Sequence, residues 1–177
     1  MIQRIQSFLL VLVVVGAVLM FMFPMATYSI PDPESGDVVT ASIDLLPKDK
    51  AVAGDTTASN IQVLMKEGPS VWPMTVLAAI IGLIALVSIF LYKNRIRQMR
   101  VVSFGFLVNI VYIGLIFLLY VDKVANLLAP VNPTGMPPMT HYSIGTWTPF
   151  VTAILLFLVQ RAIRSDEIKV QSADRLR

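Results

Sequence analysis

The chain has 177 residues, of which 56% are hydrophobic and only 14% are charged, whereas a soluble domain carries about a quarter charged residues. The formal net charge is +3 and cysteine is absent, which excludes a disulfide framework, a thiolate metal site, a cysteine nucleophile and a lipid-modified N-terminal cysteine. The hydrophobic residues form four long segments without ionisable side chains. This pattern predicts one domain over residues 1–177, an all-α integral membrane protein with four transmembrane helices.

The first predicted span covers residues 7–26, behind Arg4. Its apolar segment is longer than the core of about 7–15 residues in a secretory signal. It ends in Phe23-Pro24-Met25 and offers no small-residue cleavage site. We therefore expect a membrane anchor that is retained.

The first outer loop, residues 27–70, is polar and rich in carboxylates. Two runs of β-forming residues, 38–46 and 60–65, predict a small β-hairpin there. Because two strands are marginally stable in water, such a hairpin needs to pack against the ends of the helices.

The second and third predicted spans are residues 73–92 and 101–121. Trp72 suits the membrane interface, and Pro73 suits the first turn of a helix, where its missing N–H has no effect. The basic linker 93–100 joins the two spans. Such a short linker predicts an antiparallel helical hairpin.

The second outer loop, residues 122–142, is rich in proline and is not expected to form a continuous helix. The fourth predicted span is 143–161, with Thr148 as N-cap and Pro149 as the first helical residue. Acidic and basic residues three apart in the tail 162–177 predict that this helix continues into the cytoplasm.

The distribution of basic residues predicts the orientation. Four spans place both termini and the 93–100 linker on one side, and Lys and Arg accumulate on the cytoplasmic side. Both termini are therefore expected in the cytoplasm. Of the 14 basic residues, the outer side has only Lys48, Lys50, Lys66 and Lys123, and the inner side has Arg4, Lys93, Arg95, Arg97, Arg100, Arg161, Arg164, Lys169, Arg175 and Arg177.

Within the four spans, charged residues occur only at the end of the last one. Proton relays, pumps and voltage sensors need charged residues at membrane depth, so this absence argues against those classes. The candidate sites within the spans are therefore uncharged residues. One face of the third span carries residues at helical spacing. We interpret it as a packing stripe, in which an amide bonds to a neighbouring helix; the alternative is a polar path. A small-residue pair in the second span allows tight contact, within the chain or with a partner. The stripe is Gly105, Asn109, Tyr112, Ile116 and Tyr120, and the pair is Ala78 and Gly82.

No segment matches a catalytic, metal-binding or phosphate-binding motif. His141 is the single histidine, and a histidine without a nearby ligand is a poor metal site. We interpret it as a surface or loop-packing residue. The sequence thus predicts no enzyme, metal or cofactor.

The basic segments are explained by orientation, so nucleic acid is not an expected partner. Each Lys or Arg near an acidic leaflet also adds roughly 1 kcal/mol of attraction. Contact with anionic lipid or with a protein partner is the alternative role of these residues. The candidates are Lys93, Arg95, Arg97, Arg100, Arg161, Arg164, Arg175 and Arg177.

Several short segments carry a resemblance to a known family. They are Met1 to Gln6, Ile89 to Arg95, Tyr142 to Gly145, Arg161 to Glu167 and Ser172 to Arg177. With them the chain resembles the small four-span proteins of Bacteroidota classed as domain of unknown function four-two-nine-three. The resemblance implies a bacterial inner membrane and four helices. It implies no activity and no catalytic residue.

Two functions follow as hypotheses. The first is a non-enzymatic accessory or scaffold subunit of an inner-membrane assembly, with membrane lipids and a protein partner or a second copy as contacts. These contacts would involve the spans, the 93–100 linker and the 161–177 tail. The alternative is a small oligomeric transporter or channel for an uncharged or lipidic solute. In that case Asn109, Tyr112 and Tyr120 would line a path between protomers.

Overall fold

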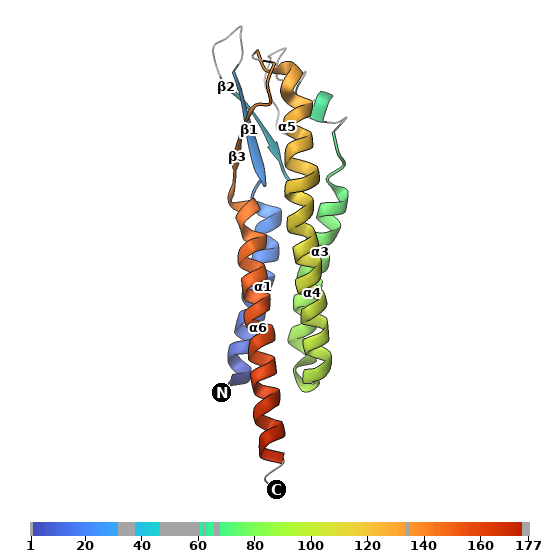
Figure 1. The fold of residues 1–177 in the computed structure, drawn as a ribbon, viewed down its shortest axis with the longest axis vertical. Coiled ribbons are helices and arrows are strands. Elements are labelled where there is room, and N and C mark those ends of the chain that lie inside the picture. Colours follow the sequence, from blue (N-terminus) through green and yellow to red (C-terminus); the bar gives the residue numbers. More distant parts are fainter. Residues whose placement is uncertain are drawn as a thin grey trace.

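The computed structural model describes residues 2–31, 38–46, 61, 63–65, 68–133 and 135–174. It is mostly helical, with a small antiparallel sheet at one end (Figure 1). The four long helices are α1 (Ile2–Met22), α3 (Trp72–Phe90), α4 (Arg95–Leu115) and α6 (Ile144–Asp174). Four helices are thus long and apolar enough to cross a membrane, which confirms the predicted number of candidate spans.

The long helices pack as a ring of neighbours. α1 contacts α3 and α6, and α4 contacts the same two helices. The start of α1, the end of α6 and the turn between α3 and α4 lie at one end, opposite the sheet (Figure 1). Neighbouring helices are therefore antiparallel.

The outer surface of the ring is apolar on every helix. Large hydrophobic side chains are exposed along it, although a soluble protein rarely exposes contiguous apolar surface of this extent. A separate set of buried side chains fills the interior. The exposed residues include Phe8, Val11, Val15, Val18, Leu83, Leu86, Phe104, Leu107, Ile110, Val151, Ile154, Phe157 and Leu158. We call these residues the apolar belt.

The turn between α3 and α4 is shorter than the predicted linker. A 3-10 turn, η1 (Leu91–Lys93), and Asn94 join the two helices. The prediction of a linker over 93–100 was wrong, because α4 already begins at Arg95. At the other end of the hairpin, α3 begins at Trp72 with a proline in its first turn, as predicted.

The third helix extends past its predicted end at residue 121. A π-helical segment, η2 (Ile116–Val121), leads into α5 (Asp122–Leu128) and the 3-10 turn η3 (Ala129–Val131). The helical stretch Arg95–Val131 has 37 residues and is about 55 Å long at the usual rise per residue. The prediction was wrong because a charged pair, Asp122 and Lys123, does not end a helix. The end comes with proline, in η3.

The sheet has three antiparallel strands in the order β2-β1-β3. β1 (Ala26–Pro31) pairs with β2 (Val38–Ile43), and of these two only β2 lies in a run that was predicted as a strand. The expected second strand over 60–65 was wrong: residues 61 and 63–65 are helical, while 60 and 62 lie outside the described residues. β3 (Met139–Tyr142) comes instead from the second outer loop.

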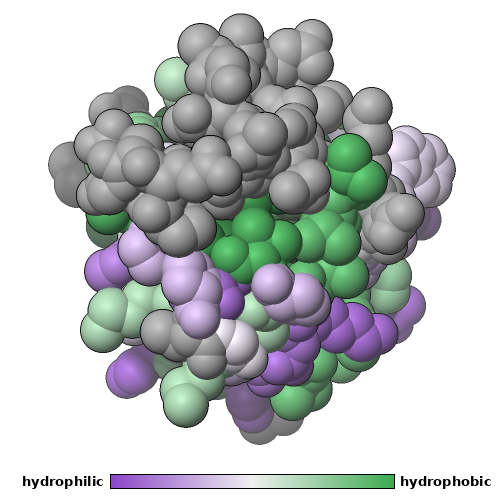
Figure 2. All heavy atoms as spheres, turned by 90° about the horizontal axis from the view of Figure 1, so that it is seen from above, coloured by the Kyte–Doolittle hydropathy of each residue, from purple (hydrophilic) through white to green (hydrophobic). Residues whose placement is uncertain are grey.

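One face of the sheet packs against α5. Tyr28 and Ile30 of β1 are buried in one cluster with Val124 and Leu128 of α5, and the Tyr28 hydroxyl donates to Val121 O at 2.9 Å. Burial, with smaller contributions from Tyr142 and Asp122, raises the pKa of the Tyr28 phenol above its usual range. It therefore remains a donor. Figure 2 shows this end of the molecule, where the described residues present hydrophobic and hydrophilic atoms side by side.

The junction between α1 and α6 joins the sheet to the helices. Met25 O accepts hydrogen bonds from Ser143 N at 3.0 Å and from the Thr146 hydroxyl. A Cβ on Gly145 would lie 2.5 Å from Pro24 O and 2.7 Å from Phe23 O, so only glycine fits this approach. We call these contacts the α1–α6 junction.

The predicted start of the fourth helix at Thr148 was wrong. α6 begins at Ile144 and contains Pro149, and the Thr148 hydroxyl donates to Ile144 O inside the helix. Pro149 lies in the second turn, beyond the first-turn positions that suit proline, and therefore removes one hydrogen bond of the helix. At the other end α6 continues to Asp174, as predicted for the tail, while Arg175 and Arg177 lie outside the described residues.

We expect opposite effects from two glycine-to-alanine substitutions. Gly145→Ala should lower the free energy of unfolding by about 1–3 kcal/mol, because its Cβ must displace backbone. Gly114→Ala, within α4, meets nothing within 4 Å and should raise it by up to about 1 kcal/mol through helix propensity. Thermal unfolding in detergent measures both. A tolerated Gly145→Ala would contradict the close approach.

Candidate functional site

The interior contact between α4 and α6 centres on Asn109. Its side chain is fully buried, and Nδ2 donates to Pro149 O at 2.9 Å. A carbonyl oxygen has two lone pairs, so Pro149 O can accept this bond in addition to one within its helix. The amide thus joins two neighbouring helices, the contact that the packing interpretation describes.

Two buried polar atoms next to this contact have no hydrogen-bond partner among the described residues: Asn109 Oδ1 and the Tyr112 hydroxyl. The residues are three apart on α4 and so lie on one face. The π-helical segment η2 begins at Ile116, one turn further on, and such segments are frequent at functional sites. An unpaired buried polar group costs about 1–3 kcal/mol. This pair is therefore the polar feature of the bundle interior that packing does not explain.

The small residues singled out from the sequence lie at contacts inside the chain. A Cβ on Gly82 would lie 3.2 Å from Ala17 Cβ of α1, and one on Gly105 would lie 2.7 Å from Ile84 Cγ2 of α3. Ala78 is fully buried in α3. The pair Ala78 and Gly82 therefore faces the bundle, where it packs within the chain.

The three side chains proposed to line a path between protomers are all inside the chain. Asn109 and Tyr112 are 0% exposed and Tyr120 is 6% exposed. The Tyr120 hydroxyl donates to Ser70 O at 2.6 Å, which joins η2 to the segment before α3. These residues therefore lie away from the outer surface that a second protomer would contact.

Several polar contacts between helices were not predicted. Gln6 Nε2 donates to Asp166 Oδ2 at 2.6 Å, joining the buried ends of α1 and α6, and Gln160 Nε2 donates to Ser103 Oγ at 2.6 Å, joining α6 to α4. Ser103 and Gln160 are uncharged polar residues within apolar segments, and this position was the sequence signal that could have indicated a contact between helices. Gln6 and Asp166 are 160 positions apart, so no local pattern links them.

The predicted basic residues gather at the end of the bundle that contains the termini. Arg97, Arg100, Arg161 and Arg164 are exposed, and Arg95 is half-buried. Within the described part of the chain, no carboxylate forms an ion pair with these five guanidinium groups. Lys93 lies in η1, and its side chain is outside what the structure describes. Among the described residues, arginines therefore predominate over carboxylates at this end.

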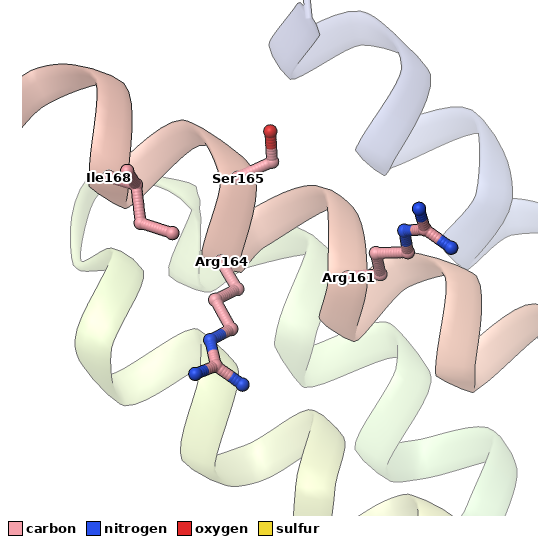
Figure 3. Close-up of a pocket in the computed structure, with 4 residues that line it drawn as sticks. All are labelled: Arg161, Arg164, Ser165 and Ile168. Carbon is pink, nitrogen blue, oxygen red and sulfur yellow. The ribbon is translucent and has the colours of Figure 1, made fainter.

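A shallow hollow lies on the outer face of α6 at this basic end. It is lined by Arg161, Arg164, Ser165 and Ile168 and has a volume of about 290 Å³. Figure 3 shows Arg161 and Ser165 pointing to one side of α6 and Arg164 pointing to the other. We call this space the α6 hollow. Its lining offers hydrogen-bond donors and one apolar side chain, a combination suited to an anion with an apolar part.

His141 lies on the exposed strand β3, opposite Thr27 of β1. The Thr27 hydroxyl donates to the His141 backbone oxygen at 3.4 Å. Among the described residues, no group of three or more His, Cys, Asp and Glu side chains could hold a metal ion.

Comparison with known proteins identifies the family. The model of the family described as Domain of unknown function (DUF4293) matches residues 2–176. The chain belongs to this family, which confirms the resemblance seen in its sequence. No curated protein and no solved structure matches the chain. The family's description assigns no activity, so a role must be inferred from the structure.

Removing two tyrosine hydroxyls from the same helical stripe should have opposite effects. Tyr120→Phe leaves Ser70 O without its bond and should lower the free energy of unfolding by about 1 kcal/mol. Tyr112→Phe removes an unpaired hydroxyl and should leave the melting temperature unchanged or raise it. Thermal unfolding of both variants in one detergent checks this. A lower melting temperature for Tyr112→Phe would mean that its hydroxyl has a bound partner in solution.

Proposed function

We propose that the chain is a four-span protein of the bacterial inner membrane and a non-enzymatic accessory or scaffold subunit of a membrane assembly. The observation that supports membrane insertion best is the apolar belt. All four long helices present large hydrophobic side chains outward, and each is long enough to cross the hydrocarbon core of about 30 Å. Exposure of such a surface to water is unfavourable, whereas contact with lipid tails is not.

The arrangement of the ends supports cytoplasmic termini. The start of α1, the end of α6 and the α3–α4 turn share one end (Figure 1), and the arginines of α4 and α6 lie there. Lys and Arg accumulate on the cytoplasmic side of membrane proteins. The sheet and α5 then lie outside the cytoplasm.

The scaffold role is supported by the way the chain uses its polar groups. Side-chain amides of the interior bond to neighbouring helices, as at Asn109, Gln98 and Gln160. α6, in contrast, runs beyond the other helices at the basic end (Figure 1). A helix end that protrudes in this way is suited to contact another protein.

The path-lining alternative has weaker support. It requires Asn109, Tyr112 and Tyr120 at the outer surface, and they are buried within the bundle. The unpaired atoms of Asn109 and Tyr112 would have to be reached from inside one chain.

Reporter fusions test the orientation. A cytoplasmic reporter fused after Arg177 or inserted at Asn94 should be active, and the same reporter inserted at Gly135, in the second outer loop, should be inactive. A periplasmic reporter at the same three positions should give the reverse pattern. Activity of the periplasmic reporter at Asn94 would contradict the topology.

A truncation tests the scaffold role. Ending the chain after Ile168 retains the Gln6–Asp166 contact and removes the last part of α6. We expect the shortened protein to stay in membranes after alkaline extraction but to lose the partner that co-purifies with the full chain in mild detergent.

The full chain provides the control for this experiment. If the full chain is a lone monomer under several mild conditions, the scaffold role is wrong. If the shortened chain keeps the same partner in the same amount, the contact does not involve the end of α6.

A further inference from the structure

The outer face of α6 changes from apolar to basic along a single stripe. Ile154, Phe157 and Leu158 are exposed on this face, and the lining of the α6 hollow follows directly. Residues three and four apart share one face of a helix, so the positions 154, 157, 158, 161, 164, 165 and 168 are continuous. The stripe therefore has the polarity profile of a lipid, with an apolar part beside a charged part.

The hollow offers donors to an anion and no acidic side chain. Two guanidinium groups and the Ser165 hydroxyl line it. Asp166, which lies next in the chain, is buried and accepts a hydrogen bond from Gln6. Asp166 therefore does not line the hollow, and Glu167, the other neighbouring carboxylate in the chain, is half-buried and is not among the lining residues. Multiple donors around one space suit the oxygen atoms of a phosphate group.

α4 adds positive charge at the same level. The hydrogen bond between Gln160 and Ser103 fixes the register of α6 against α4. Because the two helices are antiparallel, Arg164, four residues after Gln160, lies near the level of Arg100, three residues before Ser103. Arg100 is exposed. Three guanidinium groups therefore lie near the level at which α4 and α6 leave the apolar belt.

We propose that the α6 hollow is a binding site for an anionic phospholipid. Its phosphate lies beside Arg161 and accepts a hydrogen bond from Ser165, Arg164 adds positive charge from the other side of the hollow, and one acyl chain follows Phe157 and Leu158 toward the middle of the membrane. This inference rests on the proposed membrane insertion. The inference goes beyond membrane insertion. Basic residues that set the orientation of a membrane protein can lie on any face of a helix, whereas residues that bind one lipid must share a face.

The test compares lipids and variants on the purified full chain. Phosphatidylglycerol and phosphatidylcholine with identical acyl chains are added in detergent, and binding is followed by native mass spectrometry and by melting temperature. The site variant is R161Q/R164Q. The control variant R95Q/R97Q removes the same charge from the first turns of α4.

We expect phosphatidylglycerol to bind the wild type and the control variant and to raise their melting temperatures. The site variant should lose about tenfold or more of this affinity, because each arginine near an anionic headgroup contributes roughly a factor of five. Ser165→Ala should lose about threefold, without any change in charge. Phosphatidylcholine should bind weakly to all.

Three results would overturn the site. The first is an equal loss of phosphatidylglycerol affinity in both double variants, which would mean general charge attraction. The others are equal binding of the two lipids, and stabilisation by inorganic phosphate equal to that by phosphatidylglycerol, which would mean that no lipid is needed. Alkaline extraction of membranes is done for every variant. A site variant that stays inserted yet binds phosphatidylglycerol like the wild type refutes the lipid site and leaves the proposed function intact. A wild type that is extracted from membranes refutes the proposed membrane function itself.

If R161Q/R164Q fails to fold, Ser165→Ala and the single variant R161Q replace it. Unchanged affinity in both would overturn the proposal.

Discussion

The pairing of α1 with α6 is the contact on which the rest of the structure depends, because it fixes one register from end to end. At the sheet, Thr146 and Ser143 bond to Met25 O. At the opposite end Gln6 bonds to Asp166. Since β1 follows α1 and β3 precedes α6, the same register also pairs the two strands. A shift of one residue would break contacts at both ends.

The interior shows how helices associate where apolar burial gives little preference for one partner over another. Lipid tails are as apolar as leucine, so close backbone approach and hydrogen bonds between helices determine the arrangement. Gly16 lets Thr152 approach α1, and Asn109 connects α4 to α6. The unpaired atoms of Asn109 and Tyr112 are the exception to this rule. Their position next to the π-helical segment makes that part of α4 the least optimised region of the interior for packing.

The sequence predicted what depends on local patterns and missed what depends on distant contacts. Apolar segments gave four helices near their observed positions, and the tail was correctly expected to be helical. The continuation of α4 into α5 was missed because its buried face forms only against the sheet. The strand β3 was missed because it pairs with β1, more than 100 positions away. For the candidate site, the arginines could be identified from the sequence by their residue type. That they share one face of α6 became clear only from the observed start and register of this helix.

The position of the arginines contains more information than their number. Orientation in a membrane depends on how many Lys and Arg residues lie in a cytoplasmic segment and not on which face of a helix they occupy. Arg161 and Arg164 nevertheless share one face with Ser165 and Ile168, while Asp166 is buried on another. The hydrogen bond between Gln6 and Asp166 therefore has two effects at once: it joins α1 to α6 near the basic end of the bundle, and it keeps the Asp166 carboxylate away from the face that carries the two arginines.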